Sequence, residues 1–270
     1  MHEGPTRCAV VTGAASGIGR ATAELFVARG FEVIAADWSA DPLRWCDGVD
    51  HIVPVVADAS DDADNERLVG LAVEHFGRLD VAILNAGVVG SPPLEEPAAL
   101  DRFDQVLAVN VRGVASGIRH AAPAIRASGG GAIVATASTA GFRGDPGSWA
   151  YNASKAAVIN LVRAAAMDYA AQGIRVNAVA PGPVETGMTR SLADRPAMYE
   201  SMRRRIPVQR WGRPEEVAEA FWFLASPAAS FITGVTLPVD GGFSANAAHF
   251  DLPEIGGPGR TPTSVTGRPN

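Results

Sequence analysis

The sequence predicts one doubly wound α/β domain with a seven-stranded parallel sheet and helices on both faces. Short apolar runs alternate with longer segments of helical periodicity, which is the pattern that βαβ units produce. A glycine-rich turn follows the first apolar run. The composition agrees, because 47% of the residues are hydrophobic, 29 are glycine and only 7% are aromatic. No linker or low-complexity tract divides the 270 residues, so a single large domain is expected.

Each of the seven expected strands is an apolar run that stops at turn residues. In chain order the runs cover residues 8–12, 31–36, 52–57, 79–84, 132–137, 174–180 and 235–239. Helical patterns begin near residues 18, 60, 98, 151 and 214, and residues 98–118 are expected to form one continuous helix. Because helices connect the strands, the strands are expected to run parallel.

A loop rich in small residues follows the first strand. Its sequence is Gly13-Ala14-Ala15-Ser16-Gly17-Ile18-Gly19, and a helical pattern starts within it. A strand, a glycine loop and a helix N-terminus together bring backbone N–H groups and the helix dipole to a pyrophosphate. The spacing differs from the G-x-G-x-x-G fingerprint, and a plain tight turn is the alternative interpretation.

A carboxylate stands at the end of the second strand. Asp37 follows Gly19 by 18 residues and would accept hydrogen bonds from the adenosine ribose hydroxyls. It would also repel a 2′-phosphate, and no Lys or Arg lies at residues 14–16 or 38–40 to neutralise that phosphate. The sequence therefore favours NAD over NADP.

Polar or small residues follow three further strands, at the edge where open α/β sheets bind ligands. Asp58 would either bind the adenine amino group or cap the next helix. Asn85-Ala86-Gly87 would let a loop approach a flat ligand, and Ser138 follows the fifth strand. Asn110 falls inside the expected helix 98–118, an unfavourable place for a residue that prefers helix caps. Its side-chain amide would hydrogen-bond to solvent or to a nearby carbonyl, or it would be a functional group of the site.

Tyr151 and Lys155 lie four residues apart at the start of a long apolar helix pattern. This spacing puts the phenol and the ammonium group on one helix face. A cation about 4 Å away would lower the pKa of a phenol by roughly three units before desolvation opposes it, which makes a usable base. Tyr and Lys also occur four apart by chance, so the upstream motifs are needed to support this interpretation.

These motifs, in this order, resemble the short-chain dehydrogenase/reductase family, whose fold is the Rossmann fold. The matching elements cover about residues 6–243 and are Thr12-Gly13-x-x-x-Gly17-Ile18-Gly19, Asp58, Asn85-Ala86-Gly87, Asn110, Ser138, Tyr151-x-x-x-Lys155 and Pro181-Gly182-x-x-x-Thr186. The resemblance implies a homotetramer, with a dimer as the alternative, and 4-pro-S hydride transfer.

The resemblance also implies site residues. The catalytic set would be Asn110, Ser138, Tyr151 and Lys155, with Asn110 holding a water that links Lys155 to solvent. The backbone of Val184 and the hydroxyl of Thr186 would hold the nicotinamide carboxamide. The full set expected to contact the cofactor is Gly13, Ser16, Gly17, Ile18, Gly19, Asp37, Trp38, Asp58, Ala59, Asn85, Ala86, Gly87, Tyr151, Lys155, Pro181, Gly182, Val184 and Thr186.

The function predicted is reversible hydride transfer between NAD and a secondary alcohol or ketone, with Tyr151 as general base or acid. Mostly apolar residues are expected to line the substrate pocket, which suggests a medium-sized hydrophobic substrate: Val89, Thr139, Phe142, Trp149 and Met188. One alternative is a 3-oxoacyl thioester reductase of the same family, with residues 203–205 facing an acidic carrier. Another is a non-catalytic dinucleotide-binding sensor or scaffold.

The remaining expectations concern the ends and surroundings of the chain. Residues 1–243 would form the dehydrogenase domain, with a substrate lid at about 187–212, and residues 244–270 an extension that is partly disordered or packed on a neighbouring subunit. A net charge of −6 disfavours nucleic acid. The sequence shows no metal-ligand spacing. It also shows no leader and no membrane span. Cys8 and Cys46 are two isolated cysteines, which suggests reduced thiols in a cytoplasmic protein.

Overall fold

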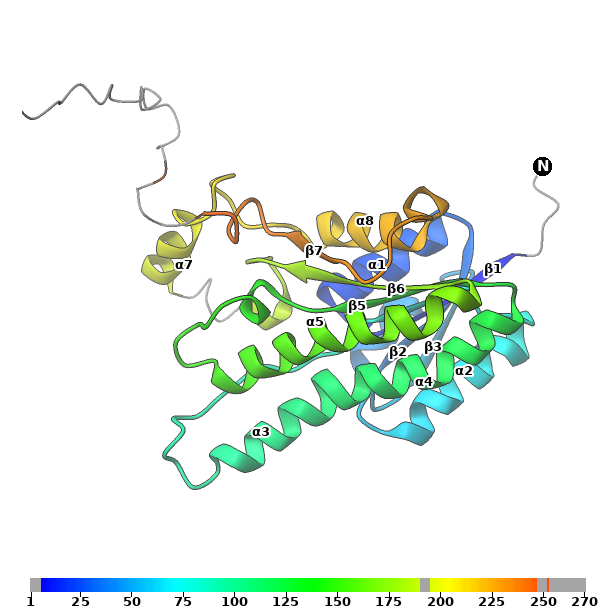
Figure 1. Ribbon diagram of the computed structural model, residues 1–270, viewed down its shortest axis with the longest axis horizontal. Coiled ribbons are helices and arrows are strands. Elements are labelled where there is room, and N and C mark those ends of the chain that lie inside the picture. Colours follow the sequence, from blue (N-terminus) through cyan, green and yellow to red (C-terminus); the bar gives the residue numbers. More distant parts are fainter. Residues whose placement is uncertain (1–5, 190–194, 247–251, 253–270) are drawn as a thin grey trace, which may run out of the picture.

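The computed structural model describes residues 6–189, 195–246 and 252. Its seven strands form one parallel sheet in the order β3-β2-β1-β4-β5-β6-β7 (Figure 1). The predicted fold class is therefore confirmed, and each predicted strand is present with small shifts at its ends. The strands are β1 Arg7–Thr12, β2 Phe31–Asp37, β3 Ile52–Val56, β4 Val81–Leu84, β5 Gly131–Thr136, β6 Ile174–Pro181 and β7 Thr236–Val239.

Helices cover both faces of the sheet (Figure 1). Helices α2, α4 and α5 pack on one face, and α1 and α8 pack on the other. The described helices are α1 Gly17–Ala28, α2 Asp62–Phe76, α3 Ala99–Leu107, α4 Gly113–Ala127, α5 Trp149–Tyr169, α7 Pro196–Arg203 and α8 Pro214–Ala225. Short 3₁₀ turns occupy Asp41–Cys46, Thr139–Gly141, Ala170–Gln172, Gly187–Thr189 and Pro227–Ala229.

The strands divide their side chains between two hydrophobic cores. Along β1, Cys8 and Val10 face the core under α2, α4 and α5, whereas Ala9 and Val11 face the core under α1 and α8. This alternation follows the two-residue period of a strand. Both faces are covered, which explains why the strands read as continuous apolar runs in the sequence.

The helix predicted over residues 98–118 is confirmed, with a π-helical turn inside it that the sequence did not predict. Helix α3 ends at Leu107, a π-helical turn occupies Ala108–Arg112, and α4 continues to Ala127. The buried Asn110 lies in this turn and bonds to the backbone of Val88. A π-turn inserts one residue into a helix and thereby turns a side chain toward partners that a regular helix would miss.

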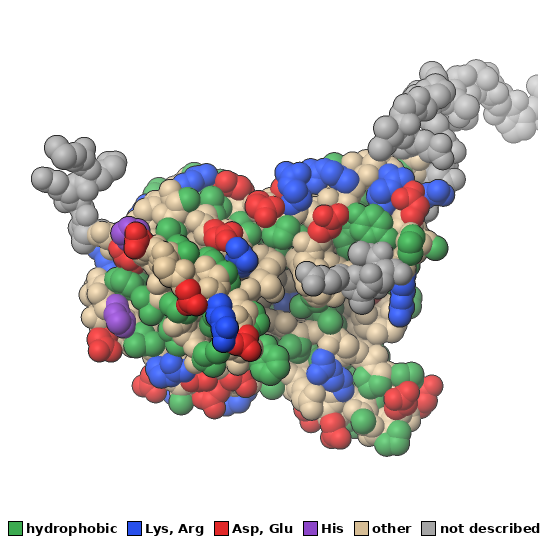
Figure 2. Space-filling view, turned by 180° about the vertical axis from the view of Figure 1, so that it is seen from behind, with side chains coloured by type: hydrophobic (Ala, Val, Ile, Leu, Met, Phe, Trp, Pro, Cys, Tyr) green, Lys and Arg blue, Asp and Glu red, His purple; other side chains and the backbone are tan. Residues whose placement is uncertain are grey.

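The sheet order fixes where a ligand can bind. The chain moves outward from β1 to β3, then returns to the other side of β1 at β4. The crossovers on the two sides of β1 therefore diverge, which leaves a crevice at the carboxyl ends of β1 and β4. Acidic and basic side chains are interspersed over the face shown in Figure 2.

Candidate active site

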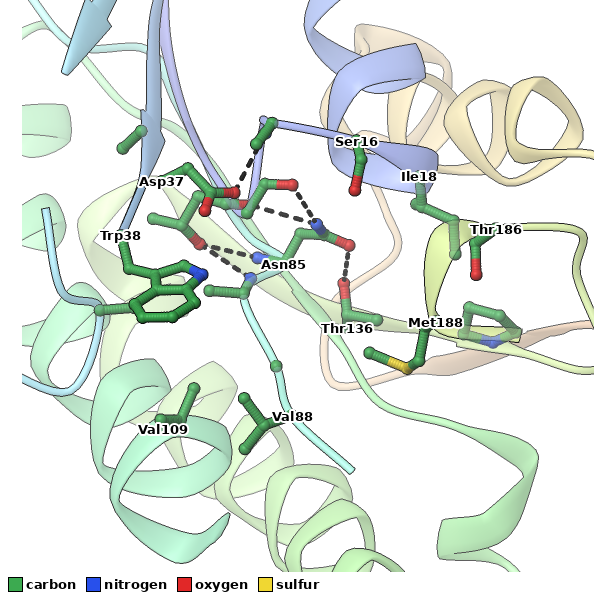
Figure 3. Close-up of a pocket in the computed structure, with 18 of the residues that line it drawn as sticks. Ser16, Ile18, Asp37, Trp38, Asn85, Val88, Val109, Thr136, Thr186 and Met188 are labelled. Carbon is green, nitrogen blue, oxygen red and sulfur yellow. Dashed lines mark hydrogen bonds between the residues drawn. The ribbon is translucent and has the colours of Figure 1, made fainter. Parts of the chain in front are cut away.

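A cavity of about 560 Å³ opens at the carboxyl ends of the strands (Figure 3). Asp37 and Trp38 lie toward one end of it, and Thr186 and Met188 lie on the other side (Figure 3). Most of the residues predicted to bind a cofactor or act in catalysis line this one cavity: Gly13, Ser16, Ile18, Asp37, Trp38, Asp58, Ala59, Asn85, Ala86, Gly87, Ser138, Tyr151, Lys155, Pro181, Gly182, Val184 and Thr186.

The glycine loop has a shape that larger residues would not allow. Gly13 and Gly17 have φ angles of +68° and +53°, in the region that favours glycine. A Cβ atom on Gly19 would lie only 2.0 Å from the carbonyl oxygen of Gly13. Gly17 and Gly19 therefore shape the loop without lining the cavity. Ser16 is the N-cap residue of α1, and its side chain makes no capping bond to the helix.

Hydrogen bonds at Ala14 and Ala15 hold the glycine loop in place. The Asp37 carboxylate accepts from the Ala15 N–H at 3.0 Å, and the Ala14 N–H donates to the carbonyl of Ala36 at 3.0 Å. The indole N–H of Trp45 donates to the Ala14 carbonyl at 3.0 Å. Trp45 was not predicted from the sequence, because 31 residues separate it from its partner.

Asp58 does not cap helix α2. The N-cap is Asp61, whose carboxylate accepts from the N–H groups of Ala63 and Asp64. The carboxylate of Asp58 instead accepts two hydrogen bonds of 2.8 Å from Ser60, one from the N–H and one from the hydroxyl. The capping alternative is therefore wrong, and Asp58 lines the cavity on an exposed turn.

Asn85 joins three strand ends beneath the cavity (Figure 3). Its amide donates to the carbonyl of Thr12 at 3.1 Å, and its amide oxygen accepts from the hydroxyl of Thr136 at 2.9 Å. The Thr12 hydroxyl in turn accepts from the N–H groups of Asn85 and Ala86 at 3.0 and 3.1 Å. Sequence reasoning missed Thr136, although its place at the end of a strand is the signal that could have found it.

Lys155 is a buried cation on the floor of the site. Its ammonium group donates to the carbonyl of Thr136 at 2.7 Å, and it lies 5.7 Å from the centre of the Tyr151 ring. Burial lowers the pKa of Lys155 to about 8, because a desolvated ammonium group is disfavoured. The lysine is therefore still mainly charged at neutral pH.

The predicted lowering of the Tyr151 pKa by Lys155 is wrong for this structure. Burial raises the pKa of Tyr151, a hydrogen bond with Ser138 lowers it, and the nearby charge of Asp145 raises it further. The Lys155 ammonium group points to a backbone carbonyl, so desolvation of the phenol prevails.

Asn110 makes three hydrogen bonds next to the cavity. Its amide donates to the hydroxyl of Ser154 at 2.9 Å and to the Val88 carbonyl at 3.0 Å, and it accepts from the Val88 N–H at 2.8 Å. A Cβ atom on Gly87 would lie 3.3 Å from the Asn110 amide oxygen and 3.5 Å from Lys155 Nζ. Asn110 therefore stands beside the lysine without lining the cavity.

Thr186 and Thr189 shape the loop after β6. The Thr186 N–H donates to the Thr189 hydroxyl at 2.9 Å, and that hydroxyl donates to the carbonyl of Val184 at 2.7 Å. Thr186, Thr189 and Val184 all line the cavity. The sequence did not point to Thr189, which fixes the turn that carries Thr186.

Of the five residues predicted for the substrate pocket, only Met188 lines the cavity. The Thr139 hydroxyl donates to the carbonyl of Pro181 at 3.4 Å. Val89 and Phe142 are 39% and 40% exposed and lie outside the cavity. The cavity is therefore lined by most of the residues predicted to contact the cofactor and by one of those predicted to contact the substrate.

Trp149, the fifth residue of that set, has a structural role at the start of α5. Its indole N–H donates to the carbonyl of Pro92 at 2.9 Å, and its ring packs on Phe103 with centres 5.4 Å apart. The Ala150 N–H next to it donates to the Ser91 hydroxyl at 3.1 Å. Trp149 thus ties the loop after β4 to the helix that carries Tyr151.

The expected lid and extension are described only in part. Residues 190–194, 247–251 and 253–270 lie outside the described residues. Within the described part, Arg203 and Arg204 both pair with Glu200, so neither points freely toward the cavity. No described helix is long and apolar enough to span a membrane. The described residues contain no group of three or more metal-ligating His, Cys, Asp or Glu side chains.

Comparison with known proteins gives relatives over nearly the whole chain. The family matched over residues 13–244 is described as enoyl-(acyl carrier protein) reductase. The chain is 40% identical to 2-(R)-hydroxypropyl-CoM dehydrogenase of Xanthobacter autotrophicus, over 89% of this chain and 99% of that protein. It is 45% identical to cis-4-hydroxycyclohexanecarboxylate dehydrogenase of Sinomonas cyclohexanicum, over 88% of this chain and 97% of that protein.

A solved structure agrees with the sequence relatives. The crystal structure of 3-ketoacyl-(acyl-carrier-protein) reductase from Brucella melitensis, complexed with NADH, aligns with a TM-score of 0.82 and 36% identity. The alignment covers 88% of this chain and 98% of that chain. The protein described here is therefore a member of the short-chain dehydrogenase/reductase family of nicotinamide dinucleotide-dependent oxidoreductases.

Proposed function

We propose that this protein interconverts a secondary alcohol and its ketone by hydride transfer, with NAD as the preferred cofactor. The observation that carries the proposal is one continuous cavity. It runs from the Asp37 carboxylate, past the glycine loop, to Ser138, Tyr151 and Lys155. The same cavity thus combines a dinucleotide cradle with proton-transfer groups, which is the combination that hydride transfer to or from an alcohol needs.

The residues fit a bound dinucleotide. Side chains on Gly13 or Gly19 would clash with Asn85 or with the loop backbone, so the loop keeps its backbone open to a pyrophosphate. Trp38 is 80% exposed at the cavity wall, where an adenine could pack against its ring. When bound, the nicotinamide supplies the acceptor or donor of the hydride.

The preference for NAD is supported by charge. The Asp37 carboxylate lines the cavity, with one oxygen bonded to the Ala15 N–H. Residues 14–16 and 38–40 contain no Lys or Arg that could neutralise a 2′-phosphate beside it. A second anion close to this carboxylate would be repelled. The Brucella melitensis structure holds NADH, which agrees with this preference.

The protein's own groups handle the proton. During oxidation the alcohol O–H proton passes to the Tyr151 phenolate while the C–H hydride leaves, and a ketone remains. Ser138 hydrogen-bonds the reacting oxygen and stabilises its developing charge. Lys155 keeps a positive charge below the site, and we propose that Asn110 positions a water between Lys155 and solvent.

The test is NADH formation by the purified protein at 340 nm. NAD and NADP are each offered with a panel of cyclic, aryl and steroidal secondary alcohols. We expect turnover with NAD and less with NADP. Absence of turnover across the panel, with NAD binding still detected by calorimetry, would contradict the proposal and leave a binding role.

A 3-oxoacyl thioester reductase is the second candidate, supported by the function of the Brucella melitensis protein. One argument for it weakens in the structure, because Arg203 and Arg204 are paired with Glu200 and do not form a free basic patch. Reduction of an acetoacetyl thioester with NADPH faster than with NADH would favour this candidate.

We also propose that the protein assembles through α5, as a homotetramer or a dimer. Ala153, Ala156, Ala164 and Met167 lie exposed along this helix, which already buries another face in the core. A second copy would cover this apolar surface. Light scattering of the purified protein would give the oligomeric state, and a monomer would contradict the proposal.

A reducing compartment, the cytoplasm, is proposed from the thiols. Cys8 and Cys46 are both buried and unpaired. Burial raises the pKa of Cys8 to about 12 and that of Cys46 to about 11, so neither forms a reactive thiolate at neutral pH.

We further propose that residues 244–270 extend from the dehydrogenase domain at residues 1–243, with residues 187–212 as the substrate lid. Deletion of residues 246–270 with unchanged kinetics and assembly would exclude a functional role for the extension.

A further inference from the structure

The first turn of helix α5 is held by partners from outside the helix. Its N-cap residue, Ser148, makes no side-chain bond to the helix. The Ala150 N–H instead donates to the hydroxyl of Ser91, in the loop after β4, at 3.1 Å. One of the free N–H groups at this helix end is thus satisfied by a distant segment. The placement of Tyr151 in the same turn therefore depends on bonds that α5 does not make by itself.

Ser154 makes a second link of this kind, three residues after Tyr151. Its side chain is fully buried, and its hydroxyl donates to the carbonyl of Tyr151 at 2.7 Å. The same oxygen accepts from the Asn110 side-chain amide at 2.9 Å. A carbonyl can only accept and an amide N–H can only donate, so a single orientation of the hydroxyl satisfies both partners. Ser154 therefore joins the residue that carries the phenol to the π-helical turn.

The Asn110 amide extends this link to the loop after β4. Its other N–H donates to the carbonyl of Val88 at 3.0 Å, and its oxygen accepts from the Val88 N–H at 2.8 Å. Val88 and Val109, the chain neighbour of Asn110, line the cavity (Figure 3). Tyr151 and Lys155 line the same cavity from α5. These bonds therefore connect the part of the loop that lines the cavity with the part of α5 that lines it.

We propose that Ser154 is a positioning residue of the reaction, through which Asn110 sets the place of the Tyr151 phenol relative to the loop after β4. The inference rests on the proposed function and adds a residue that does not itself line the cavity. Proton transfer needs the phenol within hydrogen-bond distance of the substrate oxygen, so a small shift of the first turn of α5 slows the reaction. Loss of the hydroxyl would also leave a buried N–H of Asn110 without its acceptor.

The test is the first turnover of an alcohol that the wild type oxidises, followed as NADH formation by stopped flow at saturating NAD and alcohol. Ser154→Ala should lower the rate constant of this phase by about tenfold, and the Kd for NADH should change little. The rate constant reports on the folded molecules, whereas an unfolded fraction lowers only the amplitude. A purely structural role would therefore reduce the amplitude and leave the rate constant unchanged.

Ser128→Ala is the matched control, because the Ser128 hydroxyl has the same bonding pattern away from the cavity. It donates to the carbonyl of Ala124 in its own helix at 2.9 Å and accepts from the Leu79 N–H at 3.0 Å. Ser128 lies at the C-terminal end of α4 and does not line the cavity. We expect both variants to lower Tm, since each loses a partly or fully buried pair of hydrogen bonds. Only Ser154→Ala should slow the first turnover.

A double variant tests whether Asn110 acts through Ser154. If it does, Asn110→Ala combined with Ser154→Ala should be no slower than Asn110→Ala alone, because the link is already broken. If the two residues acted separately, the two reductions in the rate constant would multiply. A multiplied reduction would overturn the shared role.

The outcomes separate the two proposals. A wild-type rate constant in Ser154→Ala, or an equal reduction in Ser128→Ala, would overturn the role of Ser154 and leave the proposed function standing. No turnover by the wild-type protein with any alcohol or ketone would refute the proposed function, and the inference with it.

Discussion

The ammonium group of Lys155 donates a 2.7 Å hydrogen bond to the backbone carbonyl of Thr136, the last residue of strand β5. Helix α5 is thereby tied to the sheet at the end of β5, where both residues line the cavity. The hydroxyl of the same Thr136 donates to Asn85, so one residue links the buried cation to the loop after β4. The position of the cation is therefore set by the strand ends and not by Tyr151 alone.

Lys155 is the only lysine in the sequence, which makes its ionisation directly measurable. We expect its side-chain amine to titrate near pH 8, since burial lowers its pKa to about 8 from 10.5. Protein labelled with ¹⁵N-lysine should give a single side-chain signal whose shift follows this titration. A midpoint at pH 10 or above would show that water reaches the amine.

The lowered pKa of Lys155 also predicts how stability changes with pH. Between pH 8 and 10.5 the unfolded chain binds more protons at this lysine than the folded protein does, so the contribution of Lys155 to the free energy of unfolding should rise with pH. The rise is about 3 kcal/mol over that range. The buried thiols of Cys8 and Cys46 act in the opposite direction above pH 9 in both proteins, so in denaturant unfolding the rise should appear as the difference in unfolding free energy between the wild type and Lys155→Met. Parallel curves would contradict the prediction.

Tyr151→Phe should lower kcat by about a thousandfold while the Kd for NADH changes little, because only the proton-transfer group is lost. In the wild type, burial raises the pKa of Tyr151, so the phenolate is scarce at neutral pH. Alcohol oxidation should therefore accelerate as pH rises, and ketone reduction should be faster at lower pH. Steady-state rates from pH 6 to 10 measure both, and Tyr169→Phe at the far end of α5 is the control.

Asp37→Asn should relax the cofactor preference. The substitution removes the charge but keeps an oxygen that can accept from the Ala15 N–H. We expect the ratio of kcat/KM for NADP over NAD to rise by about tenfold. Asp41→Asn, on the neighbouring 3₁₀ turn, is the matched control because Asp41 pairs with Arg44. A similar rise in both variants would show that the loss of any nearby negative charge changes the ratio, and that the position of Asp37 is not what sets the preference.

Trp45→Phe should weaken cofactor binding without slowing the chemical step. The variant loses the hydrogen bond to the Ala14 carbonyl and leaves the glycine loop less firmly held. We expect KM for NAD to rise about threefold at unchanged kcat. Trp222→Phe makes the same change in the aromatic cluster with Phe26 and Phe31 and should leave KM for NAD unchanged. Equal KM values for NAD in Trp45→Phe and the wild type would show that Trp45 does not support cofactor binding.

Asn110→Ala should lower both stability and turnover. The buried amide makes three hydrogen bonds, to Val88 and Ser154, and their loss costs roughly 2–4 kcal/mol of unfolding free energy. Asn177→Ala is the control, since its buried amide is also hydrogen-bonded, in this case to the backbone of Ile232 and Val235. Both variants should be destabilised, but only Asn110→Ala should lose kcat. Equal kcat values in the folded variants would leave Asn110 a purely structural residue.

The sequence predicted those features that depend on neighbours along the chain. The seven strands follow from apolar runs that end at turn residues, and the glycine loop follows from a local backbone requirement at Gly13 and Gly17. The four-residue spacing of Tyr151 and Lys155 places both on one helix face for the same reason. Backbone periodicity and turn chemistry are local, so one sequence is enough to predict them.

The tertiary structure decided which groups meet. The expected helix contains a π-helical turn, in which the buried Asn110 bonds to Val88 and Ser154, 22 and 44 residues away. Trp149 was expected to line the substrate pocket, whereas in the structure its indole N–H donates to the carbonyl of Pro92, 57 residues away. The pKa of Tyr151 depends on desolvation by the surrounding fold, which no spacing along the chain can reveal. Local order came from the sequence itself, whereas long-range hydrogen bonds and burial came only from the packed sheet and helices.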